Sequence, residues 1–235
     1  MNIQAQFFSI IIITVLLCII FIIAGNKVKK ANPFEKPKGI VLLAIMFVEM
    51  INSFVEGIID AEFAKKHGAY VGAMMAYLLI SNYSGLFGLP TPTGNFSVTL
   101  ALSIVAWIAI QATAIHHYGF RGYISNLFKP FSLFFVMNLF SIISPLLSLS
   151  LRMFGNLVSG SVIMELVYTA TAGISSFIPV IGKFNFMGVI IAPALHVYFD
   201  IFIGFMQMFI FATLVLVFVR NNIPDEENIV KEREE

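Results

Sequence analysis

The stretch Ser148-Leu149-Ser150-Leu151-Arg152-Met153-Phe154-Gly155-Asn156 places one arginine inside a long apolar region. Burying a charged side chain at the centre of a bilayer costs between about 2.5 and about 17 kcal/mol, depending on how the cost is determined. We therefore expect Arg152 to face the protein interior, a water-filled cavity or a partner subunit, and to have a function. Two simpler interpretations stay open, namely a side chain that reaches the lipid headgroups and a static ion pair. Between residues 131 and 219 the only charged side chains are Arg152, Glu165, Lys183 and Asp200.

The composition is that of a membrane protein. Of the 235 residues, 59% are hydrophobic and only 11% are charged, whereas soluble domains carry about 25% charged residues. Backbone groups in lipid must be hydrogen-bonded internally, so membrane spans are helices or closed barrels. The apolar runs are far longer than a barrel strand of about 10 residues. The sequence therefore predicts an all-α membrane protein with about five transmembrane helices and one amphipathic surface helix, the last two transmembrane helices being long and strongly tilted.

Several classes of function find no support in the residues. The net charge of +1 gives no field that would attract nucleic acid. The single cysteine, Cys18, excludes an internal disulfide, and the four histidines have no cysteine or glutamate at ligand spacing, so we expect no metal and no cofactor. A Gly-x-x-x-x-Gly-Lys-Ser/Thr loop is also absent from the sequence, so we expect no nucleotide chemistry.

The charges around the first half of the chain predict its orientation. Residues 1–26 form a first transmembrane helix, and the lysines come after it rather than before it, which indicates a retained helix with its N-terminus outside. Residues 27–68 are predicted to be a cytoplasmic loop and an amphipathic helix. That helix covers residues 39–64, with Glu49, Glu56 and Asp60 on one acidic face, and a short membrane span is the second choice.

The second half of the chain contains segments that are too long for simple spans. Residues 69–115 are predicted to form two transmembrane helices joined by a Gly/Pro loop at 85–94, and residues 116–129 a cytoplasmic loop. Residues 130–219 are predicted to form a long tilted helical hairpin, and residues 220–235 a cytoplasmic tail. More than 40 residues precede the predicted outer loop at 174–185, which is roughly 60 Å of helix against a hydrocarbon core of ~30 Å. This first part is either two helices or one tilted helix kinked near Pro145.

Polar residues form two stripes within the predicted hairpin. At about 100° per residue, Ser148, Arg152, Asn156 and Ser159 share one side of their helix. The small residues on that side permit close approach of another helix, or equally ordinary packing within the chain. Ser161 and Glu165 lie one turn apart further along the same helix. The second stripe, on the last helix, consists of His196, Asp200, Gly204 and Gln207.

The arginine stretch, taken together with Gln207 in the run Phe202-Ile203-Gly204-Phe205-Met206-Gln207-Met208-Phe209-Ile210-Phe211, resembles subunit a of the F-type ATP synthase of bacteria. Residues 95–102, Asn-Phe-Ser-Val-Thr-Leu-Ala-Leu, resemble the helix that follows the outer loop in this family. Residues 81–86, Ser-Asn-Tyr-Ser-Gly-Leu, resemble the end of the span before that loop. The resemblance covers most of the chain beyond about residue 25.

The resemblance implies a proton-translocating stator subunit in the cell membrane with its C-terminus in the cytoplasm. Arg152 would face the rotating ring of c subunits, where its charge lowers the pKa of the ring's carboxylate and blocks direct ion flow between two offset half-channels. Asn156 and Gln207 would position Arg152, and His196 with Asp200 would line the outer half-channel. The implied partners are the c-subunit ring, the subunit b stator stalk, membrane lipid and, indirectly, the F1 ATPase head, which carries the ATP chemistry. The residues of the implied proton pathway are Glu165, Asp200, His196, Gln207, Asn156, Ser161, Asn95 and Asn82.

The sequence departs from the family pattern at three positions. The family often carries an acid where this chain has Ser161 and Asn138, and commonly has Asp where this chain has Asn95. Glu165, one turn beyond Ser161, is a candidate replacement for the first of these acids. The half-channels are therefore expected to be poorer in acids than in the family, which affects the individual relay residues but not Arg152.

Two other classes of membrane protein provide alternatives. A rhomboid-like protease needs Gly-x-Ser-Gly, and Leu157-Val158-Ser159-Gly160 lacks the first glycine; the zinc-protease motif His-Glu-x-x-His is absent from the sequence. A stand-alone secondary transporter or channel, with Arg152 binding an anionic substrate, stays open. Such a transporter should act alone, whereas a stator subunit should co-purify with a ring and a soluble head.

Overall fold

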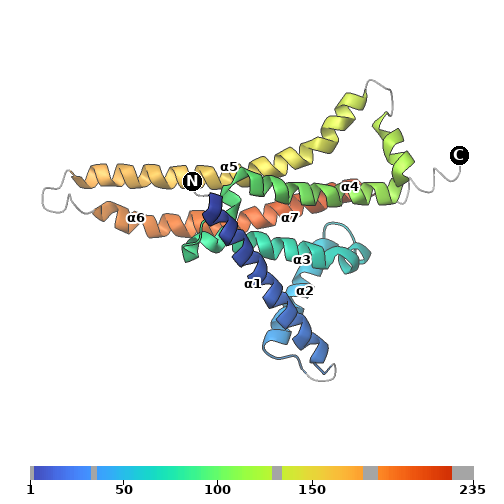
Figure 1. Ribbon diagram of the computed structural model, residues 1–235, viewed down its shortest axis with the longest axis horizontal. Helices are drawn as coiled ribbons and strands as arrows, with labels where there is room; N and C mark the ends of the chain where they lie inside the picture. Colours follow the sequence, from blue (N-terminus) through green and yellow to red (C-terminus); the bar gives the residue numbers. More distant parts are fainter. Residues whose placement is uncertain (1–2, 33–35, 129–133, 177–184, 224–235) are drawn as a thin grey trace.

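The computed structural model describes residues 3–32, 36–128, 134–176 and 185–223, and these residues fold into helices and short connections without a β-strand (Figure 1). The all-α prediction is thereby confirmed. The elements in chain order are α1 (Ile3–Lys30), α2 (Ile40–Glu56), α3 (Ala61–Tyr83), the 3₁₀ turns η1 (Ser84–Phe87) and η2 (Pro92–Gly94), α4 (Phe96–Leu127), α5 (Phe135–Ser176), α6 (Phe186–His196), the π-helical segment η4 (Val197–Phe202) and α7 (Ile203–Asn221).

Four of the described helices are long and apolar enough to cross a membrane. They run from Gln6 to Lys30, Phe96 to Ser125, Phe135 to Ser175 and Met187 to Asn221. The fifth span that the sequence predicts, at residues 69–83, forms the second part of α3, which is not among the four. Its start carries Glu62, Lys65 and Lys66, and its end carries Ser81 and Asn82, so α3 is more polar than its neighbours.

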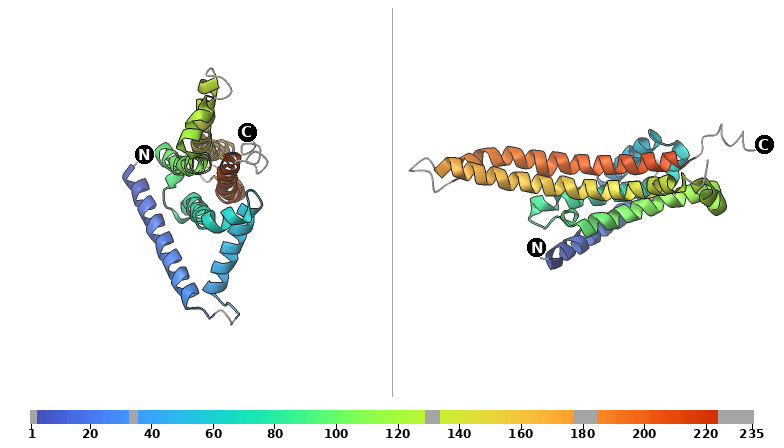
Figure 2. Two further views of the ribbon diagram at one scale, coloured as in Figure 1. Left: turned by 90° about the vertical axis from the view of Figure 1, so that its right-hand side faces the viewer. Right: turned by 90° about the horizontal axis from the view of Figure 1, so that it is seen from above.

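The longest element, α5, lies beside the α6–η4–α7 run, as the views in Figures 1 and 2 show. It is one helix of 42 residues with Pro145 inside it, which decides between the two alternatives left open for this segment. A proline inside a helix disturbs the hydrogen bonds of the preceding turn. In that turn, the Nε1 of Trp107 on α4 donates a hydrogen bond of 2.7 Å to the carbonyl oxygen of Ile142, which ties α4 to α5.

The core lies around α7, which packs against α3, α4 and α5. Phe211, Val215 and Leu216 are its most deeply buried large side chains on α7, and they meet apolar residues from α2, α3, α4 and α5. By contrast, α1 and α2 diverge from their connecting loop as the two arms of a V (Figure 2). Most of the large apolar side chains of α1 are exposed, as expected for a helix that lies in lipid.

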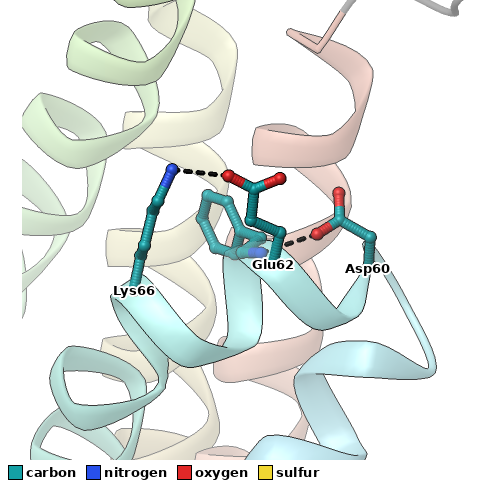
Figure 3. Close-up of polar contacts among 4 residues, drawn as sticks. Asp60, Glu62 and Lys66 are labelled. Atoms are coloured by element: carbon teal, nitrogen blue, oxygen red, sulfur yellow. Dashed lines mark hydrogen bonds and ion pairs between the residues drawn. The ribbon is translucent and has the colours of Figure 1, made fainter.

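The predicted surface helix at residues 39–64 is wrong in its extent. The structure divides it into α2, which ends at Glu56, and α3, which begins at Ala61. Asp60 is therefore not on the acidic face of α2. Its backbone is extended and its Oδ1 accepts a hydrogen bond of 2.6 Å from the backbone N–H of Phe63, as an N-cap residue does (Figure 3). The aspartate thus ends one helix and starts the next.

The predicted cytoplasmic loop at residues 116–129 is also mostly helical. Helix α4 continues to Leu127 and bends at Gly119, where φ is 68° and ψ is 159°. This backbone conformation is strained for a residue with a Cβ and is open to glycine. The polar pair His116-His117 therefore lies just before a break in the helix at Gly119, beyond which the chain is helical again to Leu127.

The first turns of α3 provide a test of local electrostatics outside the membrane spans. The Nζ of Lys66 lies 2.7 Å from the Oε1 of Glu62, and this hydrogen bond and the positive charge hold the pKa of Glu62 below its usual value of 4.5 (Figure 3). A lowered pKa means that the pair stabilises the fold above the unfolded-state pKa and loses this effect as the pH falls through the folded-state pKa. We predict that Lys66→Gln raises the pKa of Glu62 towards 4.5, measured by NMR titration of its carboxyl carbon in detergent. An unchanged titration midpoint would contradict the assigned pair.

Candidate functional site

Arg152 lies on α5 with its side chain exposed, although Leu149 and Met153 beside it are buried in the core. Within the described ranges 3–32, 36–128, 134–176 and 185–223, no hydrogen bond or ion pair engages its guanidinium group. Neither Glu165 nor Asp200, the two acids of the hairpin, is its partner. The guanidinium group of Arg152 is thus exposed at the surface and is not paired with any described residue.

One turn beyond Arg152, a pair of amide side chains joins α5 to α7, with Asn156 exposed and Gln207 buried. The Nδ2 of Asn156 donates a hydrogen bond of 2.7 Å to the Oε1 of Gln207, whose side chain is only 6% exposed. The sequence predicted that both amides would bond to Arg152, and in the structure they bond to each other instead. The Nε2 of Gln207 is buried and has no hydrogen-bond partner among the described residues.

A second set of polar contacts joins α7 to the end of α3. The Nδ2 of Asn82 donates to the carbonyl oxygen of Gly204 at 3.0 Å, and the Oδ1 of Asn82 accepts from the Oγ1 of Thr93 at 3.0 Å. The hydroxyl of Tyr83 donates to the carbonyl oxygen of Ile201 at 3.1 Å. Since a Cβ at Gly204 would lie 3.1 Å from Cε1 of Tyr83, this close approach depends on glycine.

These contacts surround a cavity of about 440 Å³ between α3, α5, η4 and α7. Five residues of the predicted pathway line it, although they come from three distant segments of the chain. Gln6 of α1 lines it too and accepts a hydrogen bond of 2.9 Å from the Nδ2 of Asn95. A cavity with several polar groups in an apolar wall is a typical binding or passage site. The five predicted residues are Asn82, Asn156, Ser161, Asp200 and Gln207.

Asp200 lies in the π-helical segment, a distortion that is often found at functional sites. Its Oδ2 is 2.6 Å from the Nδ1 of His196, and the Nε2 of the same imidazole is 2.9 Å from the hydroxyl of Tyr168 on α5. All three side chains are partly exposed, so water has access to them. The pairing of His196 with Asp200 agrees with the predicted stripe, whereas Tyr168 was not foreseen.

Three of the predicted pathway residues do not line this cavity, and of these His196 contacts it through Asp200. Glu165 is exposed on α5 and is not part of the cavity wall. The expectation that it takes over the role of the acid that the family carries at the position of Ser161 is therefore supported by no contact in the structure. Asn95 reaches the cavity only through its hydrogen bond with Gln6. Sequence reasoning missed Gln6, Tyr83 and Tyr168; their only signal is that each is a polar group at the end of an apolar run.

The match to known proteins agrees with this geometry. Residues 7–220 match the family model for the ATP synthase A chain. The chain belongs to the ATP synthase A chain family. Members of this family are the ion-translocating stator subunits of the Fo sector, and the chain is accordingly a multi-pass membrane component of an ATP synthase with Fo and F1 partners.

Subunits a of several bacterial ATP synthases are similar in sequence to this chain over most of its length. The sodium-ion-specific ATP synthase subunit a of Propionigenium modestum is 30% identical over 77% of this chain, which spans 64% of that protein. The subunit a of Mycoplasma genitalium is 31% identical over 89% of this chain and 76% of its own length. That of Mycoplasmoides gallisepticum is 26% identical over 97% of this chain and 82% of its own length.

The contact of Gly204 with Tyr83 provides a test of how this A chain holds its cavity. Gly204→Val should lower the free energy of unfolding of the purified chain in detergent by about 1–3 kcal/mol, because the branched side chain overlaps the ring of Tyr83. Gly155→Val is the matched control on α5, where a Cβ meets no atom within 4 Å. Equal stability of the two variants would show that the close packing of α7 on α3 is not required.

Proposed function

We propose that this A chain forms two offset half-channels against a rotating c ring and that Arg152 separates them, so that proton flow is coupled to rotation. The observation that carries the proposal is the outward-facing guanidinium of Arg152, which no described carboxylate neutralises. A charge of this kind, in the middle of an apolar helix, needs a partner from another chain. An acidic side chain on the ring supplies one.

Electrostatics explains how such a contact would release a proton. Two unit charges 4 Å apart attract each other by about 4 kcal/mol at an effective dielectric constant of 20. At 1.36 kcal/mol per pKa unit, this is roughly three units, enough to ionise a carboxyl group that had been protonated in lipid. The ring carboxyl thus loses its proton near Arg152 and takes up another one only after it has passed. A fixed arginine therefore makes net flow depend on rotation.

The cavity beside Asp200 is the candidate for the outer half-channel. It opens among the C-terminal end of α3, the η1–η2 connection and the middle of α5, and it ends near Asn156, one turn from Arg152. A buried donor without a partner costs about 1–3 kcal/mol, so we expect the Nε2 of Gln207 to bind water inside this cavity. Water held there links Asp200 to the region of the arginine.

The proposed orientation follows from the lysines. Lys27, Lys29 and Lys30 form the last turn of α1, which places that end of the helix in the cytoplasm by the positive-inside rule. The N-terminus and the α5–α6 connection are then outside, and the C-terminus is cytoplasmic. On this arrangement the cavity faces the outer half of the membrane. The c ring and the subunit b stalk are the proposed direct partners, and the F1 head is reached through them.

Arg152→Ala in the assembled complex tests the proposal. We expect ATP-driven acidification of inverted vesicles in sodium-free buffer to be abolished, while ATP hydrolysis by the head persists. Arg121→Ala removes an exposed arginine of α4 and should pump at the wild-type rate. Pumping at the wild-type rate by Arg152→Ala would refute the role of this residue, and a chain that transports ions without a ring would support a stand-alone transporter.

The two acids of the hairpin should differ in their effects. Asp200→Asn should reduce pumping by about tenfold or more, because it removes the only carboxylate that lines the cavity among the described residues. Glu165→Gln should have a smaller effect, because Glu165 lies outside the cavity wall. Vesicle acidification per assembled complex measures both. If neither variant slows pumping, the outer path runs elsewhere.

A further inference from the structure

The cavity beside Asp200 does not include the outer part of the hairpin. Its outermost wall residue on α5 is Met164, and its outermost wall residues on the neighbouring run are Phe199 and Asp200. Helix α5 continues for another three turns, to Ser176. A proton that enters from the outer end must therefore pass a stretch in which, among the described residues, the one side-chain hydrogen bond between α5 and α6 near Asp200 is that of Tyr168 with His196.

We propose that Tyr168 and His196 carry protons across this stretch to Asp200, with Tyr168 as the outermost proton-transfer residue. This inference rests on the proposed function and adds a residue to its outer path. The hydroxyl of Tyr168, the two ring nitrogens of His196 and the carboxylate of Asp200 form one continuous chain, with heavy-atom distances of 2.9 and 2.6 Å. Both distances fall within hydrogen-bonding range.

The direction of each hydrogen bond follows from the groups themselves. An ionised carboxylate only accepts hydrogen bonds, so the Nδ1 of His196 carries the proton that it shares with Asp200. The Nε2 of the neutral ring is then an acceptor, and the hydroxyl of Tyr168 donates to it. Both hydrogen bonds thus point towards Asp200, so that when a proton binds the oxygen of Tyr168, another proton is transferred to the carboxylate of Asp200.

The transfer makes and breaks only O–H and N–H bonds. A proton from water binds the phenolic oxygen of Tyr168 while the phenol's own proton passes to the Nε2 of His196. The imidazolium then gives its Nδ1 proton to the carboxylate of Asp200, so that one proton has moved from water to the acid. The ring is left protonated on Nε2. After Asp200 has passed its proton on, water returns the ring to its first tautomer by giving a proton to Nδ1 and taking one from Nε2, and the partial exposure of these side chains gives water access to both nitrogens.

The surrounding backbone fixes this arrangement. The Nδ2 of Asn185 donates to the carbonyl oxygen of Tyr168 at 3.3 Å and lies 3.1 Å from the Oγ1 of Thr171, and its Oδ1 caps the start of α6 at Gly188. The turn of α5 that carries Tyr168 is therefore fastened to α6. The carboxylate of Glu165, one turn earlier on α5, is exposed and makes no hydrogen bond to a described residue, so it is not part of this chain of groups.

Three replacements of Tyr168 in the assembled complex separate proton transfer from positioning. Tyr168→Phe keeps the ring and loses the hydroxyl, and Tyr168→Gln keeps a hydrogen-bond donor that cannot relay a proton. Both should slow ATP-driven acidification per complex by about fivefold or more, because a water must take over the transfer. Tyr168→His keeps a group that both accepts and releases protons, and should recover a large part of the rate. Recovery by Tyr168→Gln would overturn the proposal, because the hydroxyl would then only hold His196 in place.

Two controls accompany these variants. Tyr198→Phe removes the hydroxyl of a nearby tyrosine that stacks on Phe202; this hydroxyl makes no hydrogen bond to another described residue, so the variant should pump normally. Arg152→Ala is measured in parallel. If Arg152→Ala is inactive and Tyr168→Phe pumps at the wild-type rate, only the relay is wrong, whereas an active Arg152→Ala contradicts the proposed function itself.

Discussion

The constraint on which the structure depends is the cost of holding one guanidinium group inside an apolar helix. A chain can meet that cost with its own carboxylate, and the two acids of the hairpin would have been available for this purpose. The described structure instead pairs Asp200 with His196 and leaves Arg152 exposed on α5. An arginine that is not neutralised by its own chain attracts the carboxylate of a neighbour, and this attraction is what a rotary stator needs.

The rest of the scaffold holds the helix of this arginine in place. The Asn156–Gln207 pair joins α5 to α7, and the Asn82–Gly204 contact joins α7 to α3. Hydrogen bonds between side-chain amides are directional, so they fix the rotation of one helix against the next more strictly than apolar packing does. The same residues enclose the cavity beside Asp200. One set of polar side chains thus both fixes the helix that carries Arg152 and lines the cavity that water can enter.

Much of this arrangement could be predicted from the sequence, because it follows from composition and helical periodicity. The overlong apolar segment of α5, its partner run and the proximity of Asp200 to His196 all follow from apolar length and from spacing along a helix, although apolar length alone did not decide whether α5 is one helix or two. The boundary at Asp60 could not be predicted in this way, because an aspartate fits an acidic helix face as well as an N-cap. The helical continuation past His116 was missed because two histidines and a glycine resemble a loop.

The contacts between distant segments required the structure. Whether Tyr168 meets His196 depends on the register between α5 and the opposite run, and the π-helical segment changes that register within Val197–Phe202. Periodicity at 100° per residue assumes an unbroken α-helix and cannot detect such a change. The participation of Gln6 depends in the same way on how α1 crosses the connection after α3.

The most direct measurement of the central claim is disulfide cross-linking in the assembled complex with Cys18 replaced by serine. Ser159 shares the exposed side of α5 with Arg152, whereas Met153 points into the core. A cysteine at position 159 should form a disulfide with cysteines placed next to the carboxylate of the ring, and a cysteine at position 153 should not. Cross-links from position 159 that never reach the ring would contradict the claim that Arg152 faces a rotor.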